Sequence, residues 1–185
     1  FLVFAYITFV LFMFLEPDMS KAQMAEKHSA LVELQGIIAE DETASADNII
    51  SALRSAFEDT KTKGIILRIN SPGGTPVQAG YIYDEIVRLR GQYPETPLYA
   101  VVSDMAASGG YYVASAADEI YASKSSIVGS IGVRMDSFGV VEAMKKLGIE
   151  SRLLTAGENK ALMDPFSPVD EDARKHLQSM IDEIH

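Results

Sequence analysis

The residues KGIILRINSPGG (63–74) combine a continuous apolar run over 63–70 with a glycine-containing turn. The residues PLYAVVSDMAASGG (97–110) repeat this arrangement, and apolar residues recur at helical spacing over 77–89 between the two. Strand–helix–strand units whose strands are apolar on both faces are typical of a parallel sheet covered by helices. In such sheets, functional groups collect in the loops beyond the carboxyl ends of the strands.

The alternation continues on both sides of these units. Over 45–60, apolar residues stand at helical spacing after Ser45 or Asp47, either of which can cap the helix. Residues 170–185 also have helical spacing. Further expected elements are strands at 31–38, 119–123 and 150–156, helices at 108–117 and 138–147, and a glycine-broken apolar run at 127–133. The sequence therefore predicts an α/β domain.

Composition excludes several classes of protein. The 185 residues are 48% hydrophobic, which suits one folded domain, and the net charge of −10 argues against a general nucleic-acid binder. Cysteine is absent, which excludes disulfides, thiolate metal sites and a cysteine nucleophile. The only histidines are His28, His176 and His185, so a multi-histidine metal site is disfavoured and a Ser-His-Asp triad has no obvious base.

The first segment, FLVFAYITFVLFMFL (1–15), has no charged residue. A helix of this length is about 22 Å long and is shorter than the roughly 20 residues that a helix needs to cross a bilayer core. We therefore expect this segment to be the end of a transmembrane anchor. A buried core helix and a signal peptide are the alternatives. Residues 16–30 are expected to connect this anchor to a main domain at 31–185, whose helical pattern still runs at His185 and suggests truncation there.

Two glycine pairs at strand ends are candidates for chemistry. Gly73–Gly74 and Gly109–Gly110 can turn backbone amides toward an anion or can simply form turns. Ser108 is either a nucleophile among small neighbours or a plain helix N-cap. A serine nucleophile needs a base, and a lysine serves as one only where burial or nearby positive charge favours its neutral form. Lys160, in a partly apolar stretch, is the candidate.

Four motifs in this order, SPGG (71–74), MAASGGYY (105–112), VGSIGV (128–133) and TAGENKALMDPFSP (155–168), resemble the membrane-anchored signal peptide peptidase family, SppA, in its short single-domain form. The resemblance runs from about Leu31 to the end of the chain. It implies a Clp protease/crotonase-like fold, in which helices surround a parallel sheet, preceded here by the N-terminal transmembrane helix.

The resemblance also implies a site. Ser108 would be the nucleophile and Lys160 the general base of a Ser/Lys dyad, with Ser130 orienting the lysine. The amides of Gly74 and Gly109 would form the oxyanion hole. No metal or organic cofactor and no nucleic acid is implied.

The implied substrates are hydrophobic peptides, such as signal-peptide remnants. The implied partners are membrane lipid, through residues 1–15, and copies of the same chain in a ring- or dome-shaped homo-oligomer. The implied location is the bacterial inner membrane, with a single pass and an extracytoplasmic catalytic domain. The alternatives are a non-catalytic membrane-tethered scaffold on the same fold and a crotonase-like acyl-CoA enzyme, which would not need both Ser108 and Lys160.

Overall fold

The computed structural model describes residues 27–157 and 159–185. The chain forms two compact units that divide between Val128 and Gly129, and each is described by itself. The elements before this division are β1 (His28–Gln35), α3 (Ala46–Glu58), β2 (Thr62–Ser71), α4 (Pro76–Gln92), β3 (Leu98–Ala107), α5 (Gly109–Ala114) and β4 (Glu119–Ala122), and the short strand β5 (Ile127–Gly129) spans it. The second unit contains α6 (Val141–Leu147) and α7 (Glu171–Ile184).

The first unit is built on a parallel sheet in the order β1-β2-β3-β4, and β5 pairs with β3. Parallel pairing places Leu34 beside Ile69 and Ile69 beside Val102, so the carboxyl ends of three strands meet at one edge. Strands β2 and β3 have the apolar cores that the sequence predicted. The expected parallel α/β sheet is confirmed.

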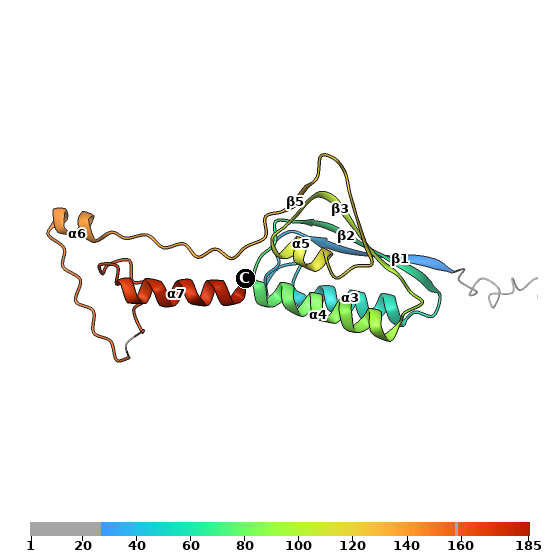
Figure 1. Ribbon diagram of the computed structural model, residues 1–185, viewed down its shortest axis with the longest axis horizontal. Helices are drawn as coiled ribbons and strands as arrows, with labels where there is room; N and C mark the ends of the chain where they lie inside the picture. Colours follow the sequence, from blue (N-terminus) through green and yellow to red (C-terminus); the bar gives the residue numbers. More distant parts are fainter. Residues whose placement is uncertain (1–26, 158) are drawn as a thin grey trace, which may run out of the picture. The chain divides into compact units, whose positions relative to one another are not determined.

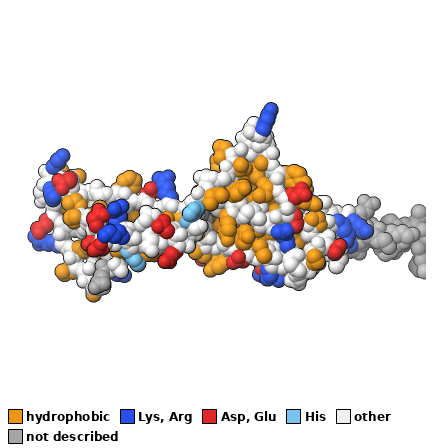
Figure 2. Space-filling model, viewed as in Figure 1, with side chains coloured by type: hydrophobic (Ala, Val, Ile, Leu, Met, Phe, Trp, Pro, Cys, Tyr) orange, Lys and Arg blue, Asp and Glu red, His pale blue; other side chains and the backbone are white. Residues whose placement is uncertain are grey.

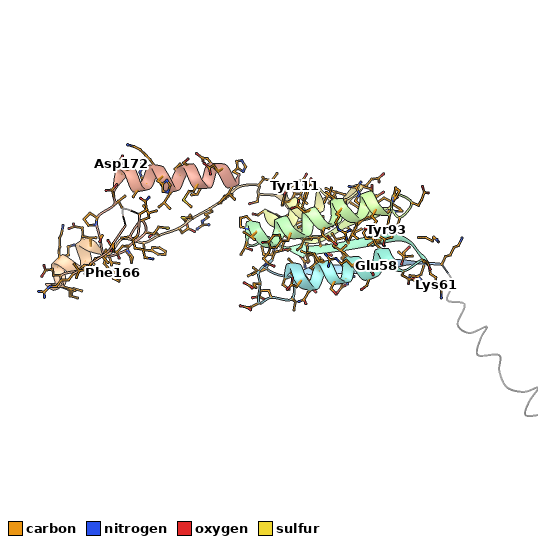
Figure 3. All side chains as sticks on the ribbon, turned by 90° about the horizontal axis from the view of Figure 1, so that it is seen from below. Glu58, Lys61, Tyr93, Tyr111, Phe166 and Asp172 are labelled. Carbon is orange, nitrogen blue, oxygen red and sulfur yellow. The ribbon has the colours of Figure 1, made fainter. Side chains whose placement is uncertain are left out.

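Helices α3 and α4 lie on the same side of this sheet (Figure 1). The core between them and the strands is aliphatic, and Leu53, Ile69 and Ile82 are fully buried in it. Each such side chain stabilises the fold by roughly 1.5–3 kcal/mol through its removal from water. The rings of Phe57 and Tyr93 meet at 5.7 Å between centroids where the two helices end. Figure 3 labels Glu58, the last residue of α3, and Tyr93, which follows α4, at these ends. The sheet is therefore held rigidly from one side.

Local sequence fixes where these helices begin. Ser45 caps α3, because its side chain accepts a hydrogen bond from the Asn48 amide, which selects Ser45 over Asp47 as the cap. Thr75 caps α4 by accepting from the Gln78 amide, and Pro76 fits the first turn, where no amide donor is needed. The start of α4 thus comes directly after the Gly73–Gly74 turn.

A buried carboxylate joins the two helices. Glu85 on α4 is only 7% exposed and accepts a hydrogen bond of 2.6 Å from Arg54 on α3. It also accepts from Arg88, one turn further along α4, at 2.7 and 2.8 Å. Two guanidinium groups therefore compensate for the burial of one carboxylate.

The second unit has a different character, since none of its described residues is buried. Asp170 is the N-cap of helix α7. Its carboxylate accepts hydrogen bonds of 2.8 and 2.9 Å from the amides of Asp172 and Ala173. The strand predicted at 150–156 is wrong, because residues 151–155 have no regular structure. Leu154 in that run is 97% exposed, so the apolar pattern of the run does not correspond to burial against a sheet.

The predicted transmembrane segment, 1–15, lies outside the described residues, as does most of the expected connector at 16–30. Strand β1 begins at His28, inside the range predicted as connector. Among the described residues, no helix combines the length and apolar character needed to cross a bilayer.

Candidate active site

Ser108 stands at a sharp turn between β3 and α5. Strand β3 ends in the buried small residues Ala106 and Ala107, and α5 begins at Gly109. Ser108 adopts φ 50° and ψ −122°, a conformation that is costly for any residue with a Cβ. Its side chain makes no capping hydrogen bond, so the reading of Ser108 as a plain helix N-cap is not supported. A strained strand-to-helix turn that presents a free hydroxyl is typical of serine nucleophiles.

The Gly73–Gly74 turn packs directly against this serine. Strands β2 and β3 are paired in parallel up to Ser71 and Ala106, so the two loops leave the sheet side by side. Gly73 has φ +91°, and a Cβ on it would lie 2.7 Å from the Gly109 nitrogen and 2.9 Å from the Ser108 Cβ. Only glycine fits at this contact.

The direction of the Gly74 amide follows from its peptide plane. The Gly73 carbonyl accepts a hydrogen bond of 3.0 Å from the Ile38 amide, and the Ile38 carbonyl accepts one of 2.8 Å from Thr75. Because N–H and C=O point in opposite directions across a trans peptide, the Gly74 amide points away from Ile38 and takes no part in this bridge.

The Gly109 amide is the second donor near Ser108. Gly109 is the first residue of α5, where amides have no acceptor within the helix. The Gly74 nitrogen lies 3.5 Å from the position that a Gly109 Cβ would take, so the two amides are neighbours. Two unpaired amides beside a free hydroxyl are suited to stabilising an oxyanion during acyl transfer.

Ser71, which was not among the residues predicted from the sequence, stabilises the Gly73–Gly74 turn. It is fully buried at the end of β2. Its Oγ donates a hydrogen bond of 2.6 Å to the Gly36 carbonyl and accepts one of 3.1 Å from the Gly73 amide. The signal available in the sequence was its place as the last strand residue before Pro-Gly-Gly.

The other two predicted residues belong to the second unit. Ser130 follows β5 directly, is exposed and has φ 52°. Lys160 is also exposed, and its amide donates to the Gly157 carbonyl at 3.3 Å. The structure thus gathers Ser108, Gly109 and Gly74 within the first unit, and the roles of all five residues stay predictions.

In the described part of the chain, no group of three or more His, Asp or Glu side chains is arranged to hold a metal ion.

Two family models match this chain. The model of peptidase family S49 matches residues 92–185, and the Clp protease model matches residues 20–128. Together they span the sheet, the serine turn and the whole second unit. The Clp protease match agrees with the parallel sheet and the helices that cover it.

Individual proteins are similar over most of the chain. Protease 4 of Haemophilus influenzae is 33% identical over 171 residues, which is 90% of this chain and 27% of that protein. The chloroplastic serine protease SPPA of Arabidopsis thaliana is 38% identical over 64% of this chain and 17% of its own length. A Na(+)/H(+) antiporter NhaA of Brucella melitensis is 45% identical over 77% of this chain, but the match covers only 19% of the antiporter. This chain therefore spans about a quarter or less of these relatives.

Proposed function

The chain belongs to peptidase family S49, a family of serine peptidases, and we propose that it cleaves hydrophobic peptides with Ser108 as nucleophile and Lys160 as general base. The observation that carries this proposal is the strained turn at Ser108, with its uncapped hydroxyl beside the amides of Gly74 and Gly109. A structural serine at a helix start would cap the helix in a relaxed conformation.

The proposed reaction is acyl transfer in two steps. The Lys160 amine takes the proton of the Ser108 hydroxyl while Oγ attacks the peptide carbonyl carbon, and the carbonyl oxygen becomes an oxyanion held by the amides of Gly74 and Gly109. The C–N bond then breaks as the protonated lysine returns the proton to the leaving amine. Water, deprotonated by the same amine, attacks the ester carbon; the bond to Ser108 Oγ then breaks, the lysine returns its proton to Oγ, and the peptide acid is released.

Ser130 is proposed to orient Lys160 by hydrogen bonding, as the resemblance to the signal peptide peptidases implies. A lysine in this role must be shielded from water in the assembled enzyme, because a solvated amine is protonated near neutral pH. We therefore propose that neighbouring subunits in a ring- or dome-shaped homo-oligomer cover the second unit and shield the lysine from water.

The uncharged segment at residues 1–15 supports a membrane anchor that holds the enzyme beside its substrates. We propose a single pass through the bacterial inner membrane, an extracytoplasmic catalytic domain, and signal-peptide remnants as natural substrates. Peptides left in a bilayer are apolar, which fits the apolar substrate class.

The test compares Ser108→Ala and Lys160→Ala in the full-length protein. Each variant is expected to lower kcat/KM for a hydrophobic peptide by roughly 10⁴-fold or more, and the double variant is expected to lose no more than the worse single one, because the two groups act as a unit. Wild type should also be labelled covalently at Ser108 by a fluorophosphonate.

Matched controls are Ser115→Ala, at the other end of α5, and Lys146→Ala, on α6. Both are expected to cleave at the wild-type rate. Normal cleavage by Ser108→Ala would contradict the assignment of Ser108 as the nucleophile, whereas a wild-type protein that cleaves no peptide would favour the non-catalytic scaffold. Normal cleavage by Lys160→Ala alone would leave the nucleophile in place and exclude this base.

A further inference from the structure

The hydroxyl of Ser71 is the buried polar side chain closest in sequence to the Gly73–Gly74 turn. Both of its hydrogen-bonding directions are used, one to the Gly36 carbonyl and one from the Gly73 amide. The Gly36 amide in turn donates to the Asn70 carbonyl at 2.9 Å. The hydroxyl therefore joins the end of β1 to the turn that follows β2.

The start of α5 also rests on Ser71. A Cβ added to Gly110 would lie 3.0 Å from the Ser71 carbonyl oxygen and 3.3 Å from its Cβ. Ser71 thus lies where the end of β1, the glycine turn and the helix after Ser108 come together. A change in its side chain reaches both amides of the candidate oxyanion hole.

We propose that Ser71 is a positioning residue that fixes the direction of the Gly74 amide; this inference rests on the proposed function, since it assigns that amide to the oxyanion. Gly73 has no side chain to restrain it, so its two flanking peptide planes must be held from outside. The Ser71 hydroxyl holds the preceding plane through the Gly73 amide, and Ile38 holds the following plane through the Gly73 carbonyl. Without the first restraint, the backbone of Gly73 can change its φ angle, and the plane that carries the Gly74 amide is held by the Ile38 hydrogen bond alone.

The test is Ser71→Ala, with Thr62→Val as its matched control. Thr62 is also buried and lies at the opposite end of β2, where its hydroxyl is 3.4 Å from the His28 ring. Ser71→Ala is expected to lower kcat by roughly 10- to 100-fold with KM changed less than about twofold, because the oxyanion exists only in the transition state. Thr62→Val is expected to change neither constant by more than about twofold.

A peptide aldehyde supplies a second readout, since its adduct with Ser108 carries an oxyanion in a stable complex. Its inhibition constant should rise in Ser71→Ala by about the same factor by which kcat falls. The proposal is overturned if kcat is unchanged, or if the two variants lose kcat equally and in proportion to a common fall in Tm.

Hydrogen exchange separates this inference from the proposed function. In Ser71→Ala, the Gly73 amide, which loses its acceptor, and the Ile38 amide, which donates to the Gly73 carbonyl, should exchange at least about tenfold faster, while the amides of the β2 core keep the wild-type rate. Faster local exchange in a protein that cleaves no peptide would support the positioning role and refute the peptidase. Unchanged exchange at the Ile38 amide would overturn the positioning role whether or not peptides are cleaved.

Discussion

The two units of this chain differ in what holds their functional residues in place. In the first unit, Ser108 and its neighbouring amides stand on a parallel sheet with an aliphatic core. In the second unit, Lys160 and Ser130 are exposed and none of the described side chains around them is buried. Figure 2 shows hydrophobic side chains gathered on the visible face of the first unit, whereas charged side chains are interspersed over that of the second.

This difference indicates which part of the proposed site the first unit can form by itself. Backbone amides need only a fixed main chain, and the sheet provides it. A lysine base needs exclusion of water as well as position, because its charged form is favoured wherever water reaches it. We therefore expect substitutions that change side-chain shape to have a large effect in the first unit. The same kind of substitution should have little effect in the second unit unless a partner surface covers it.

The largest effect is expected from Gly73→Ala. A methyl group there meets the Gly109 nitrogen at 2.7 Å and the Ala107 carbonyl oxygen at 2.8 Å, and backbone atoms cannot move aside easily. Together with the positive φ, this should lower the free energy of unfolding by roughly 3–5 kcal/mol. Cleavage should fall by roughly 10²-fold or more as the amides separate. Urea denaturation and peptide kinetics measure the two effects.

The matched change in the second unit is Gly148→Ala. Gly148 also has positive φ, at +69°, but a Cβ on it would meet nothing within 4 Å. Only the backbone conformation is penalised, so the expected loss is about 1 kcal/mol with cleavage within about twofold of wild type. Equal losses from the two glycines would remove the contrast between the units.

Next in size is Leu53→Ala, on the inner face of α3. Leu53 is fully buried, so the cavity left behind should cost roughly 2–5 kcal/mol of unfolding free energy. The matched change, Leu154→Ala, should cost less than about 0.5 kcal/mol, because Leu154 is 97% exposed. Urea denaturation of the full-length protein measures both losses. A loss above about 2 kcal/mol for Leu154→Ala would mean that another protein surface covers Leu154 in that protein.

The same contrast explains how far the sequence could be interpreted. In the first unit the predicted strand at 63–70 and helix at 77–89 correspond to β2 and α4 within three residues at each end, because burial imposes their apolar periods. In the second unit the run at 150–156 has the composition of a strand, but it pairs with no strand among the described residues. Apolar composition predicts structure only where a core exists to receive it.

For the site, the sequence predicted which residues take part but not the directions in which their side chains and amides point. The motifs named Ser108, Gly109 and Gly74, and the packing of their loops follows from the parallel order of β2 and β3. The strained dihedral angles of Ser108 and the pairing of the Ser71 hydroxyl depend on contacts between residues distant in sequence. Those contacts are set by the tertiary fold, which local patterns do not encode.

The smallest expected effect concerns the charges of the two units. Hydrogen bonds from Arg88 and then Arg54 lower the pKa of Glu85 from 4.5 to about 2, against the opposing effect of burial. A depressed carboxyl pKa stabilises the fold fully above the unfolded-state value near 4.5, and this stabilisation is lost as the pH falls from there toward 2. The shift corresponds to about 3 kcal/mol, and we expect about 2 kcal/mol because both arginine side chains are half exposed.

Glu85→Gln should therefore lower the free energy of unfolding by about 2 kcal/mol at pH 7 and by much less at pH 2.5, as measured by urea denaturation at both values. The matched change is Glu142→Gln on α6, which removes an exposed ion pair with Lys145 and should cost less than about 0.5 kcal/mol at either pH. If Glu85→Gln were equally destabilising at both pH values, its carboxylate charge would not be what joins α3 to α4. The junction between the two helices would then depend on side-chain shape and neutral hydrogen bonds.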